Sequence, residues 1–402
     1  MQKPLMVTEP YLPSPAGYQA RLTGIWERNW LTNQGPLVRE LEQKLQAHHG
    51  VSFPIHCVVN GAIGLQLIIK ALDLRGEIIT TPFSYVATAA AARWEGHRVV
   101  FADIEPDHLT LDPAAVEAAI TPRTEAILAT HVFGNPCDVE ALDAIGKKHG
   151  LAVIYDAAHA FGVTYQGKSL LTWGDASMVS THATKLFHTI EGGFICAPNG
   201  ALARKMEWMR RFGHDGNERF HGIGTNAKMS EVHAAMGLSI LDEITAVFEQ
   251  RRRLVELYDA ALATIGCVRP AMTLRAGTGW NWSYYPVLCE SESDVRALME
   301  QFHTMQIFPR RYFHPALHKV PELQSEASTD CPVAERIART ILCLPLAASY
   351  QAEHVNRVVE TLKIIDQRKQ LTLHTTLWGI LNTLTPHLAD PNDALLAFQQ
   401  WI

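Results

Sequence analysis

The sequence predicts a doubly wound α/β domain, built around a largely parallel β-sheet and followed in the chain by a smaller α+β domain. Short runs rich in β-branched residues alternate with segments of helical periodicity, as in a sheet whose strands are joined by helices. Most of these runs are apolar on both faces, which is typical of strands covered on either side. The 402 residues, 47% apolar and 19% charged, suffice for two or three packed domains.

The elements of the large domain, residues 1–247, follow from this alternation. Strands are expected at residues 77–81, 98–101, 126–131, 151–155, 176–180 and 193–197. Helices are expected at residues 61–72, at 112–120 with Pro113 in the first turn, and at 139–149.

A second domain is expected over residues 248–366. A charged, helix-favouring stretch from about residue 229 to about residue 263 leads into it. A strand at 283–288, a helix at 293–305, an irregular segment at 307–315 and a helix at 351–365 follow. Residues 367–402 are expected to form a helical extension. Its basic residues are sparse, which favours a packing or subunit contact over a membrane-surface helix.

Charge and composition exclude several classes of function. The net charge of −6 gives no nucleic-acid footprint, and no stretch approaches the ~20 apolar residues of a membrane span. Seven scattered cysteines without a C-x-x-C spacing, and an N-terminus without an apolar leader, predict reduced thiols in a cytoplasmic protein. Pro315 separates His314 from His318, so no histidine spacing predicts a metal site.

An amine and a carboxylate are spaced as a pyridoxal phosphate enzyme requires. Asp156 ends the apolar run 151–156, and Lys185 follows twenty-nine positions later. The cofactor needs an amine for a Schiff base and a carboxylate that keeps its ring nitrogen protonated. Ser180 closes the strand before Lys185 and is a candidate phosphate ligand. Ligands of open α/β sheets bind beyond the carboxyl ends of the strands, where these residues are expected.

Two glycine-containing segments suggest phosphate binding, with different outcomes. Residues 60–64 combine a capping Asn60 with small residues before an apolar helix, which suits a phosphate at a helix N-terminus. Residues 222–227 imitate a dinucleotide fingerprint, but they follow an irregular polar segment instead of a strand. A nicotinamide cofactor is therefore rejected.

Five motifs in order carry a resemblance to a known family. They are WLTNQGP at 30–36, TPFSYVAT at 81–88, DAAH at 156–159, HATK at 182–185 with EGG at 191–193, and NAKMSE at 226–231. From about residue 7 to residue 365 the chain resembles the DegT/DnrJ/EryC1/StrS sugar aminotransferases. The resemblance implies a fold-type I, aspartate-aminotransferase-like architecture and a homodimer whose active sites lie at the subunit interface.

The resemblance also implies roles for cofactor-binding residues. Lys185 forms the Schiff base and moves a proton, Asp156 pairs with the pyridinium nitrogen, His159 lies near the ring and its phenolic oxygen, and Tyr85 stacks on the ring. The phosphate is bound at Gly61, by the N–H groups of Ala62 and Ile63, by Ser180, and by Asn226 from the partner subunit. Many relatives have Thr or Ser in place of Ala62, so one hydroxyl contact is missing here.

Substrate contacts are implied in two regions. Arg310, Arg311, Tyr312 and His314 match the segment of the small domain that faces the substrate, and Arg suits a diphosphate. Which arginine points inward stays open. Thr32, Asn33 and Lys228 belong to the same set of expected substrate contacts.

Lys185 indicates which reaction is expected, because family members that dehydrate sugars without transamination have His in its place. L-glutamate is expected to convert the cofactor to pyridoxamine 5'-phosphate, and the amine then passes to a nucleotide-linked keto-sugar. Residues 79–88, 155–163 and 310–313 are most similar to enzymes that make dTDP-4-amino-4,6-dideoxy-D-glucose from dTDP-4-dehydro-6-deoxy-D-glucose, for surface polysaccharides or other deoxyaminosugars. A 3-aminotransferase is the alternative within the family, and a non-catalytic sugar-nucleotide sensor is the alternative outside it.

Overall fold

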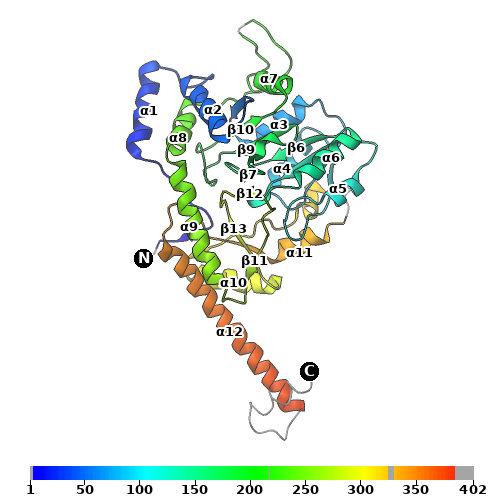
Figure 1. Cartoon of the computed structure of the whole chain (residues 1–402), viewed down its shortest axis with the longest axis vertical. Helices are drawn as coiled ribbons and strands as arrows, with labels where there is room; N and C mark the ends of the chain where they lie inside the picture. Colours follow the sequence, from blue (N-terminus) through cyan, green and yellow to red (C-terminus); the bar gives the residue numbers. More distant parts are fainter. Residues whose placement is uncertain (1–2, 217, 325–329, 385–402) are drawn as a thin grey trace.

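A seven-stranded mixed β-sheet forms the centre of the large domain (Figure 1). In this computed structural model, which describes residues 3–216, 218–324 and 330–384, the strand order is β2-β10-β9-β6-β5-β3-β4. The strands are β2 (Ile55–Val58), β3 (Glu77–Thr80), β4 (Val99–Phe101), β5 (Thr124–Thr130), β6 (Ala152–Asp156), β9 (Ala176–Ser180) and β10 (Gly193–Cys196). All six predicted strands are confirmed, with ends within two residues of the expected ones, and β2 is an addition.

The sheet is parallel except at one edge, as predicted. The pairs β4–β3, β3–β5, β5–β6 and β6–β9 are parallel, whereas β10 runs antiparallel to both β9 and β2. The carboxyl ends of β5, β6 and β9 therefore open on the same edge of the sheet.

Helices cover both faces of this sheet, because successive side chains of each strand enter different cores. Ile79 and Val153 belong to one core, and their neighbours Ile78 and Ile154 belong to the other. The first core is completed by α2 (Pro36–His49), α5 (Pro113–Ala119), α6 (Val139–His149) and α8 (Glu231–Leu241), and the second by α3 (Gly61–Ala71), α4 (Val86–Trp94) and α7 (Gly200–Met209). The predicted doubly wound arrangement is confirmed.

Polar caps determine where several of these helices begin. The side chains of Asn60, Asp112 and Asp138 each accept a hydrogen bond from a first-turn N–H of α3, α5 and α6. Helix α6 ends at Gly150, whose φ of 68° is a left-handed conformation that costs glycine least. The cap at Asn60 places the N-terminus of α3 at the carboxyl edge of the sheet.

A third core organises the C-terminal half. It joins α9 (Ile244–Leu262), α10 (Glu292–Thr304) and α12 (Ala352–Leu384) to the sheet β11 (Arg269–Pro270), β13 (Tyr285–Leu288) and β15 (Ile341–Leu344). Val247 packs in the first core and Leu254 in the third, so α9 passes from one to the other. We propose a domain division near residue 247 on this basis. Helix α11 (Pro332–Thr340) packs against the second core.

Further elements of the described chain are helix α1 and short strands, two pairs of which link its two halves. They are α1 (Pro15–Arg28), β1 (Leu5–Met6), β7 (Thr164–Tyr165), β8 (Lys168–Ser169), β12 (Thr278–Gly279) and β14 (Ile307–Phe308). Strand β1 pairs with β14, and β12 pairs with β7, so the N-terminus and the C-terminal half each cross the expected boundary.

Two expectations about helices need correction. The stretch expected to be one helix from about residue 229 is two helices, α8 and α9, which break at Asp242 and Glu243. The Glu243 carboxylate accepts hydrogen bonds from the Ser14 N–H and the Tyr11 hydroxyl, which ties the break to the N-terminal segment. Helix α12 also runs unbroken through Asp366 and extends away from the body (Figure 1). Residues 385–402 of the expected extension lie outside the described residues.

Three general expectations concern cysteines, metals and membranes. The seven cysteines are free and buried, as predicted. Within the ranges that the structure describes, no group of three or more His, Cys, Asp or Glu side chains is arranged to hold a metal ion. In the same part of the chain, no helix is long and apolar enough to cross a membrane.

Candidate active site

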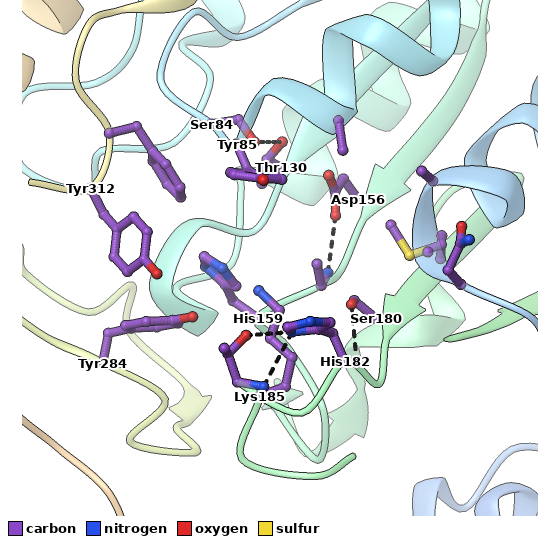
Figure 2. A pocket seen from close by; sticks show the side chains of 18 of the residues that line it. Ser84, Tyr85, Thr130, Asp156, His159, Ser180, His182, Lys185, Tyr284 and Tyr312 are labelled. Carbon is purple, nitrogen blue, oxygen red and sulfur yellow. Dashed lines mark hydrogen bonds between the residues drawn. The ribbon is translucent and has the colours of Figure 1, made fainter. Parts of the chain in front are cut away.

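A cavity of about 370 Å³ lies at the carboxyl edge of the large sheet, between the two halves of the chain (Figure 2). Thr130, Asp156 and Ser180 line it from the ends of β5, β6 and β9. The other lining residues are Asn60, Gly61, Ala62, Ser84, Tyr85, Ala87, Ala158, His159, Met178, His182, Thr184, Lys185, Glu191, Gly192, Tyr284, Arg310, Tyr312 and Phe313. The cavity therefore brings together the expected amine, carboxylate and helix N-terminus.

Asp156 is a buried carboxylate held by two hydrogen bonds. The Thr88 hydroxyl donates to Oδ2 at 2.7 Å, and the Ala158 N–H donates to Oδ1 at 3.0 Å. Burial raises the pKa of this carboxyl, while the two hydrogen bonds and the charge of Lys185 act in the opposite direction. The site therefore has a desolvated acid whose ionised form depends on neighbouring donors.

Lys185 lies half-buried in the loop between β9 and β10. Its Nζ is 6.0 Å from the centre of the Tyr284 ring. Burial lowers the pKa of the amine to about 8, against the opposing effects of Asp156 and Tyr85, and Arg310 lowers it further. A substantial neutral fraction is therefore present near pH 8, and a neutral amine can act as a nucleophile or accept a proton.

His159 is neutral and fixed in one tautomer. Its Nδ1 accepts a hydrogen bond from the Phe133 N–H at 3.1 Å, so the ring proton resides on Nε2. The imidazole lies nearly parallel to the Phe133 and Phe313 rings, at 6.0 and 5.9 Å, and 4.6 Å from the Tyr284 ring. Burial, followed by the charge of Lys185, holds its pKa well below the ordinary value.

The N-terminus of α3 forms the polar end of the cavity. Gly61 and Ala62 line it, and a Cβ on Gly61 would lie 2.8 Å from the Met178 sulfur, so only glycine fits without a shift. First-turn N–H groups have no partner within their own helix, which makes this end suitable for a phosphate. Ser180 is half-buried beside it.

Ile63 differs from the other two expected backbone contacts to the phosphate. Its N–H donates to the Asn60 side chain at 2.9 Å, and Ile63 does not line the cavity. The same capping bond that begins the helix thus occupies the N–H that was expected to bind phosphate. Gly61 and Ala62 remain as the backbone donors at this end.

The two arginines differ in where they point. Arg310 lines the cavity, with its guanidinium 4.7 Å from the centre of the Tyr312 ring. Arg311 instead donates to the Glu292 carboxylate at 3.2 Å and to the Arg339 carbonyl at 3.0 Å. His314, expected near the substrate, is exposed beside Arg311 at 3.1 Å. Of the expected small-domain contacts, only Arg310 and Tyr312 line the cavity.

Four expected residues lie outside the cavity of their own chain. Thr32 and Asn33 are exposed, and Asn33 lines a separate hollow beside Trp30. Asn226 is exposed and accepts a hydrogen bond from Lys228, whose Nζ is 4.5 Å from the Phe212 ring. None of the four therefore completes the site within one described chain.

Several residues of the site have no role in the sequence analysis. Tyr284 is buried just before β13, and burial is the main cause of its raised pKa. Ser84 and Thr130 line the cavity, and Thr88 supports Asp156. Ser84 and Thr88 fall within the quoted motif at 81–88, which was the available signal. Tyr284 and Thr130 were hidden in segments that read as ordinary strands.

The residues present fit a pyridoxal phosphate cofactor. The cavity has one lysine amine, one buried carboxylate at the end of a neighbouring strand, and a helix N-terminus with a serine hydroxyl beside it. These are the three groups that the aldehyde, the ring nitrogen and the phosphate of the cofactor require.

Known proteins share this organisation along nearly the whole chain. The model of the DegT/DnrJ/EryC1/StrS aminotransferase family matches residues 16–363. The chain is 38% identical over 372 residues to dTDP-4-amino-4,6-dideoxy-D-glucose transaminase of Shigella dysenteriae, covering 91% of this chain and 100% of that protein. It is 36% identical over 369 residues to the transaminase of the same name from Escherichia coli, covering 90% and 98%.

Solved structures agree with the sequence comparison. The crystal structure of DesI in the presence of its TDP-sugar product superposes with a TM-score of 0.87 and 35% identity, covering 94% of this chain and 96% of that one. This likeness confirms the predicted fold-type I architecture. The matched motifs, the fold and the convergence of Lys185 and Asp156 on one cavity show that the chain belongs to the DegT/DnrJ/EryC1/StrS aminotransferase family.

Proposed function

We propose that this aminotransferase transfers the amino group of L-glutamate to dTDP-4-dehydro-6-deoxy-D-glucose and yields dTDP-4-amino-4,6-dideoxy-D-glucose. The convergence of Lys185 and Asp156 on a single cavity carries the chemistry. Identities of 38% and 36% to two dTDP-4-amino-4,6-dideoxy-D-glucose transaminases, over nearly their whole length, support the sugar.

The cofactor of the proposed reaction is pyridoxal 5'-phosphate. Bound in the cavity, it supplies an electron sink for the carbon that gains or loses the amino group. Asp156 would keep a proton on the ring nitrogen, and Gly61, Ala62 and Ser180 would bind the phosphate. Because Ala62 has no hydroxyl, the phosphate would have one hydrogen bond fewer than in relatives with Thr or Ser there, a loss of about 1.5–3 kcal/mol that weakens cofactor binding without removing it.

Lys185 and the aromatic residues perform the remaining steps. The Lys185 amine would hold the cofactor and, once free again, would move a proton at the substrate carbon, for which its lowered pKa of about 8 is suited. Neutral His159 offers its Nε2–H to the cavity without adding a charge. Tyr85, exposed at the start of α4, is positioned to cover the cofactor ring once a ligand fills the cavity.

Arg310 and Tyr312 form the proposed substrate side of the cavity. The guanidinium of Arg310 has its forked donors available for a carboxylate or a diphosphate, and the Tyr312 ring supports it. Arg311 and His314 hold the small domain together instead.

We propose that a second copy of the chain completes the site, because Thr32, Asn33, Asn226 and Lys228 do not line their own cavity. These four residues belong to two stretches of the chain, around residues 31–33 and 212–228. Both stretches expose apolar side chains that a subunit interface would bury. They include Leu31, Phe212, Phe220 and Ile223, with Ile223 87% exposed. We also propose that the enzyme works in the cytoplasm. Its product would supply deoxyaminosugars for surface polysaccharides such as O-antigen.

A panel of nucleotide-linked keto-sugars tests the proposed substrate. The protein, L-glutamate and pyridoxal 5'-phosphate are incubated with 4-keto and 3-keto sugars carried on dTDP, UDP or GDP. Product mass and NMR show whether an amine forms and which carbon carries it. Amination at C-4 of the dTDP sugar supports the proposal, and amination at C-3 assigns the chain to the alternative 3-aminotransferases. Tight binding of a sugar nucleotide without turnover would instead establish a sensor.

A further inference from the structure

Three buried hydroxyl groups are connected in series to the carboxylate of Asp156. The Thr130 hydroxyl donates to the Ser84 oxygen at 3.2 Å, and the Ser84 and Thr88 oxygens are 2.7 Å apart. The Thr88 hydroxyl donates to Asp156 Oδ2 at 2.7 Å. We call Thr130, Ser84 and Thr88 the hydroxyl chain. The three residues come from the end of β5, the turn before α4 and the first turn of α4.

The direction of these hydrogen bonds follows from the number of protons available. A hydroxyl group has one proton to donate. When Asp156 is ionised it can only accept, so Thr88 gives its proton to Asp156 and the bond between Ser84 and Thr88 must be donated by Ser84. Ser84 then has only its lone pairs for Thr130, which agrees with Thr130 as the donor. All hydroxyl protons of the chain therefore point towards Asp156.

This polarity favours the ionised carboxylate. A proton on Oδ2 would make that oxygen a weaker acceptor, so the hydrogen bond from Thr88 is stronger to the ionised carboxylate than to the neutral acid. Successive hydrogen bonds polarise one another, so each added hydroxyl strengthens the final bond to Asp156. All three hydroxyl residues are nearly inaccessible to solvent, with exposures of 3%, 2% and 0% for Thr130, Ser84 and Thr88. Thr88 does not line the cavity, so water least easily replaces its hydroxyl.

We propose that the hydroxyl chain positions Asp156 and keeps it ionised towards the cavity, so that it is ready to hold the proton of the cofactor's ring nitrogen. The inference rests on the proposed function, because Thr88, Ser84 and Thr130 can affect the reaction in this way only if Asp156 pairs with the cofactor. These are positioning residues, since they act through Asp156.

Other ionisable groups also face Asp156, and the hydroxyl chain differs from them in acting on this carboxylate alone. Lys185, from the loop after β9, is the charged group that favours its ionised form. The remaining titratable groups that line the cavity are Tyr85, His159, His182, Glu191, Tyr284, Arg310 and Tyr312. An effect of the hydroxyl chain must therefore be measured against variants that leave all of these in place.

Cofactor affinity measured against pH tests the proposal in the full-length chain. The dissociation constant of pyridoxal 5'-phosphate is determined from pH 5 to 9 for the wild-type protein and for Thr88→Val, Thr88→Ser, Ser84→Ala, Thr130→Val and Asp156→Asn. The difference from Asp156→Asn isolates the Asp156 contribution from the titration of the cofactor phosphate. The midpoint at which this contribution disappears on acidification is the quantity compared.

The hydroxyl chain predicts a graded result. Thr88→Val should move the midpoint upward by about one to two pH units, the size expected for a lost hydrogen bond to a charged group. Ser84→Ala and Thr130→Val should move it by successively smaller amounts, and Thr88→Ser should restore the wild-type midpoint. If Thr88→Val does not fold, the other two variants still test the proposal. The midpoint of Ser84→Ala should then be higher than that of Thr130→Val, and both should be higher than that of the wild type.

Two failures are distinguishable. Equal midpoints in the wild type, Thr88→Val, Ser84→Ala and Thr130→Val, all different from Asp156→Asn, would overturn the hydroxyl chain and leave the proposed function intact. A wild-type profile identical to that of Asp156→Asn would remove the role of Asp156 itself, and with it both proposals.

Discussion

Replacing Lys185 by methionine should stabilise the cofactor-free protein. Burial in the cavity lowers the pKa of this amine from 10.5 to about 8, which means that the folded state holds the protonated amine less favourably than the unfolded chain does. Methionine has a side chain of similar length and carries no charge to desolvate. The Lys185→Met variant removes this cost and keeps most of the packing.

The magnitude and the sign follow from the two pKa values. The difference between 10.5 and about 8, at 1.36 kcal/mol per unit, corresponds to about 3 kcal/mol. Between these values the unfolded chain binds more protons than the folded one, so wild-type stability rises with pH in that window. The advantage of Lys185→Met should therefore be complete below about pH 8 and should disappear as the pH approaches 10.5.

Denaturant unfolding of the cofactor-free proteins at several pH values measures this difference. Wild type and variant are compared at one subunit concentration, because association stabilises the folded state. Lys168→Met is a matched control, since Lys168 is exposed on β8 and surface substitutions change stability by less than about 0.5 kcal/mol. A Lys185→Met variant that is no more stable than wild type at pH 7, or whose advantage persists unchanged to pH 10, would refute the reasoning.

Further predictions concern the chemistry and the assembly. Asp156→Asn should fold normally and lose turnover by about 100-fold or more, as expected when a charged partner of the reacting system is neutralised; unchanged turnover would exclude its role. Borohydride should fix pyridoxal phosphate to the wild-type protein and not to Lys185→Ala, and mass spectrometry that finds the label elsewhere would contradict the assignment of the amine. Equal mixing of inactive Lys185→Ala and Asn226→Ala chains should restore about a quarter of the sites, through mixed dimers with one intact site each. No recovered activity in verified mixed dimers would count against a shared site. Arg310→Gln should raise the KM for at least one substrate at least tenfold, whereas Arg311→Gln, which loses contacts outside the cavity, should chiefly lower the melting temperature; the reverse pattern would exchange their roles.

The buried strands could be predicted from the sequence because their requirements are local. A strand covered on both faces needs apolar residues side by side, and β3, β5, β6 and β9 each contain two to four adjacent apolar residues. Strand β2 was not predicted, because His56 interrupts its apolar residues. That imidazole is buried and bonded to the Ala203 carbonyl at 3.0 Å, a partner 147 positions away that no local pattern reveals.

Helix α4 was not predicted either, for a different reason. Its sequence, VATAAAARW, is mostly alanine, and it contains too few large apolar side chains to show a clear helical periodicity. Packing of its alanines against the second core makes it a helix at this position. The break between α8 and α9 was equally hidden, since it depends on contacts of Glu243 with Tyr11 and Ser14.

The residues of the candidate site also differ in whether the local sequence could predict them. Asp156, Lys185 and Ser180 follow from strand ends, because consecutive parallel strands bring their carboxyl ends to one edge of the sheet. The direction of a side chain within a motif does not follow. Arg310 and Arg311 are adjacent and chemically identical, but Arg311 is held away from the cavity by contacts that include Glu292 and the Arg339 carbonyl.

Burial acts on Asp156 and Lys185 together, yet the proposed reaction needs opposite outcomes from them. Desolvation favours the neutral form of both groups, raising the pKa of the carboxyl and lowering that of the amine. A neutral amine suits a residue that must accept a proton, whereas a neutral carboxyl could not hold a proton on the cofactor ring. The Ala158 N–H and the hydroxyl chain donate to Asp156 and not to Lys185. They therefore counteract the effect of burial on the pKa of the carboxyl and leave the lowered pKa of the amine unchanged. Fixed hydrogen-bond donors, rather than burial itself, therefore separate the acid–base properties of the two residues, as paired catalytic groups require.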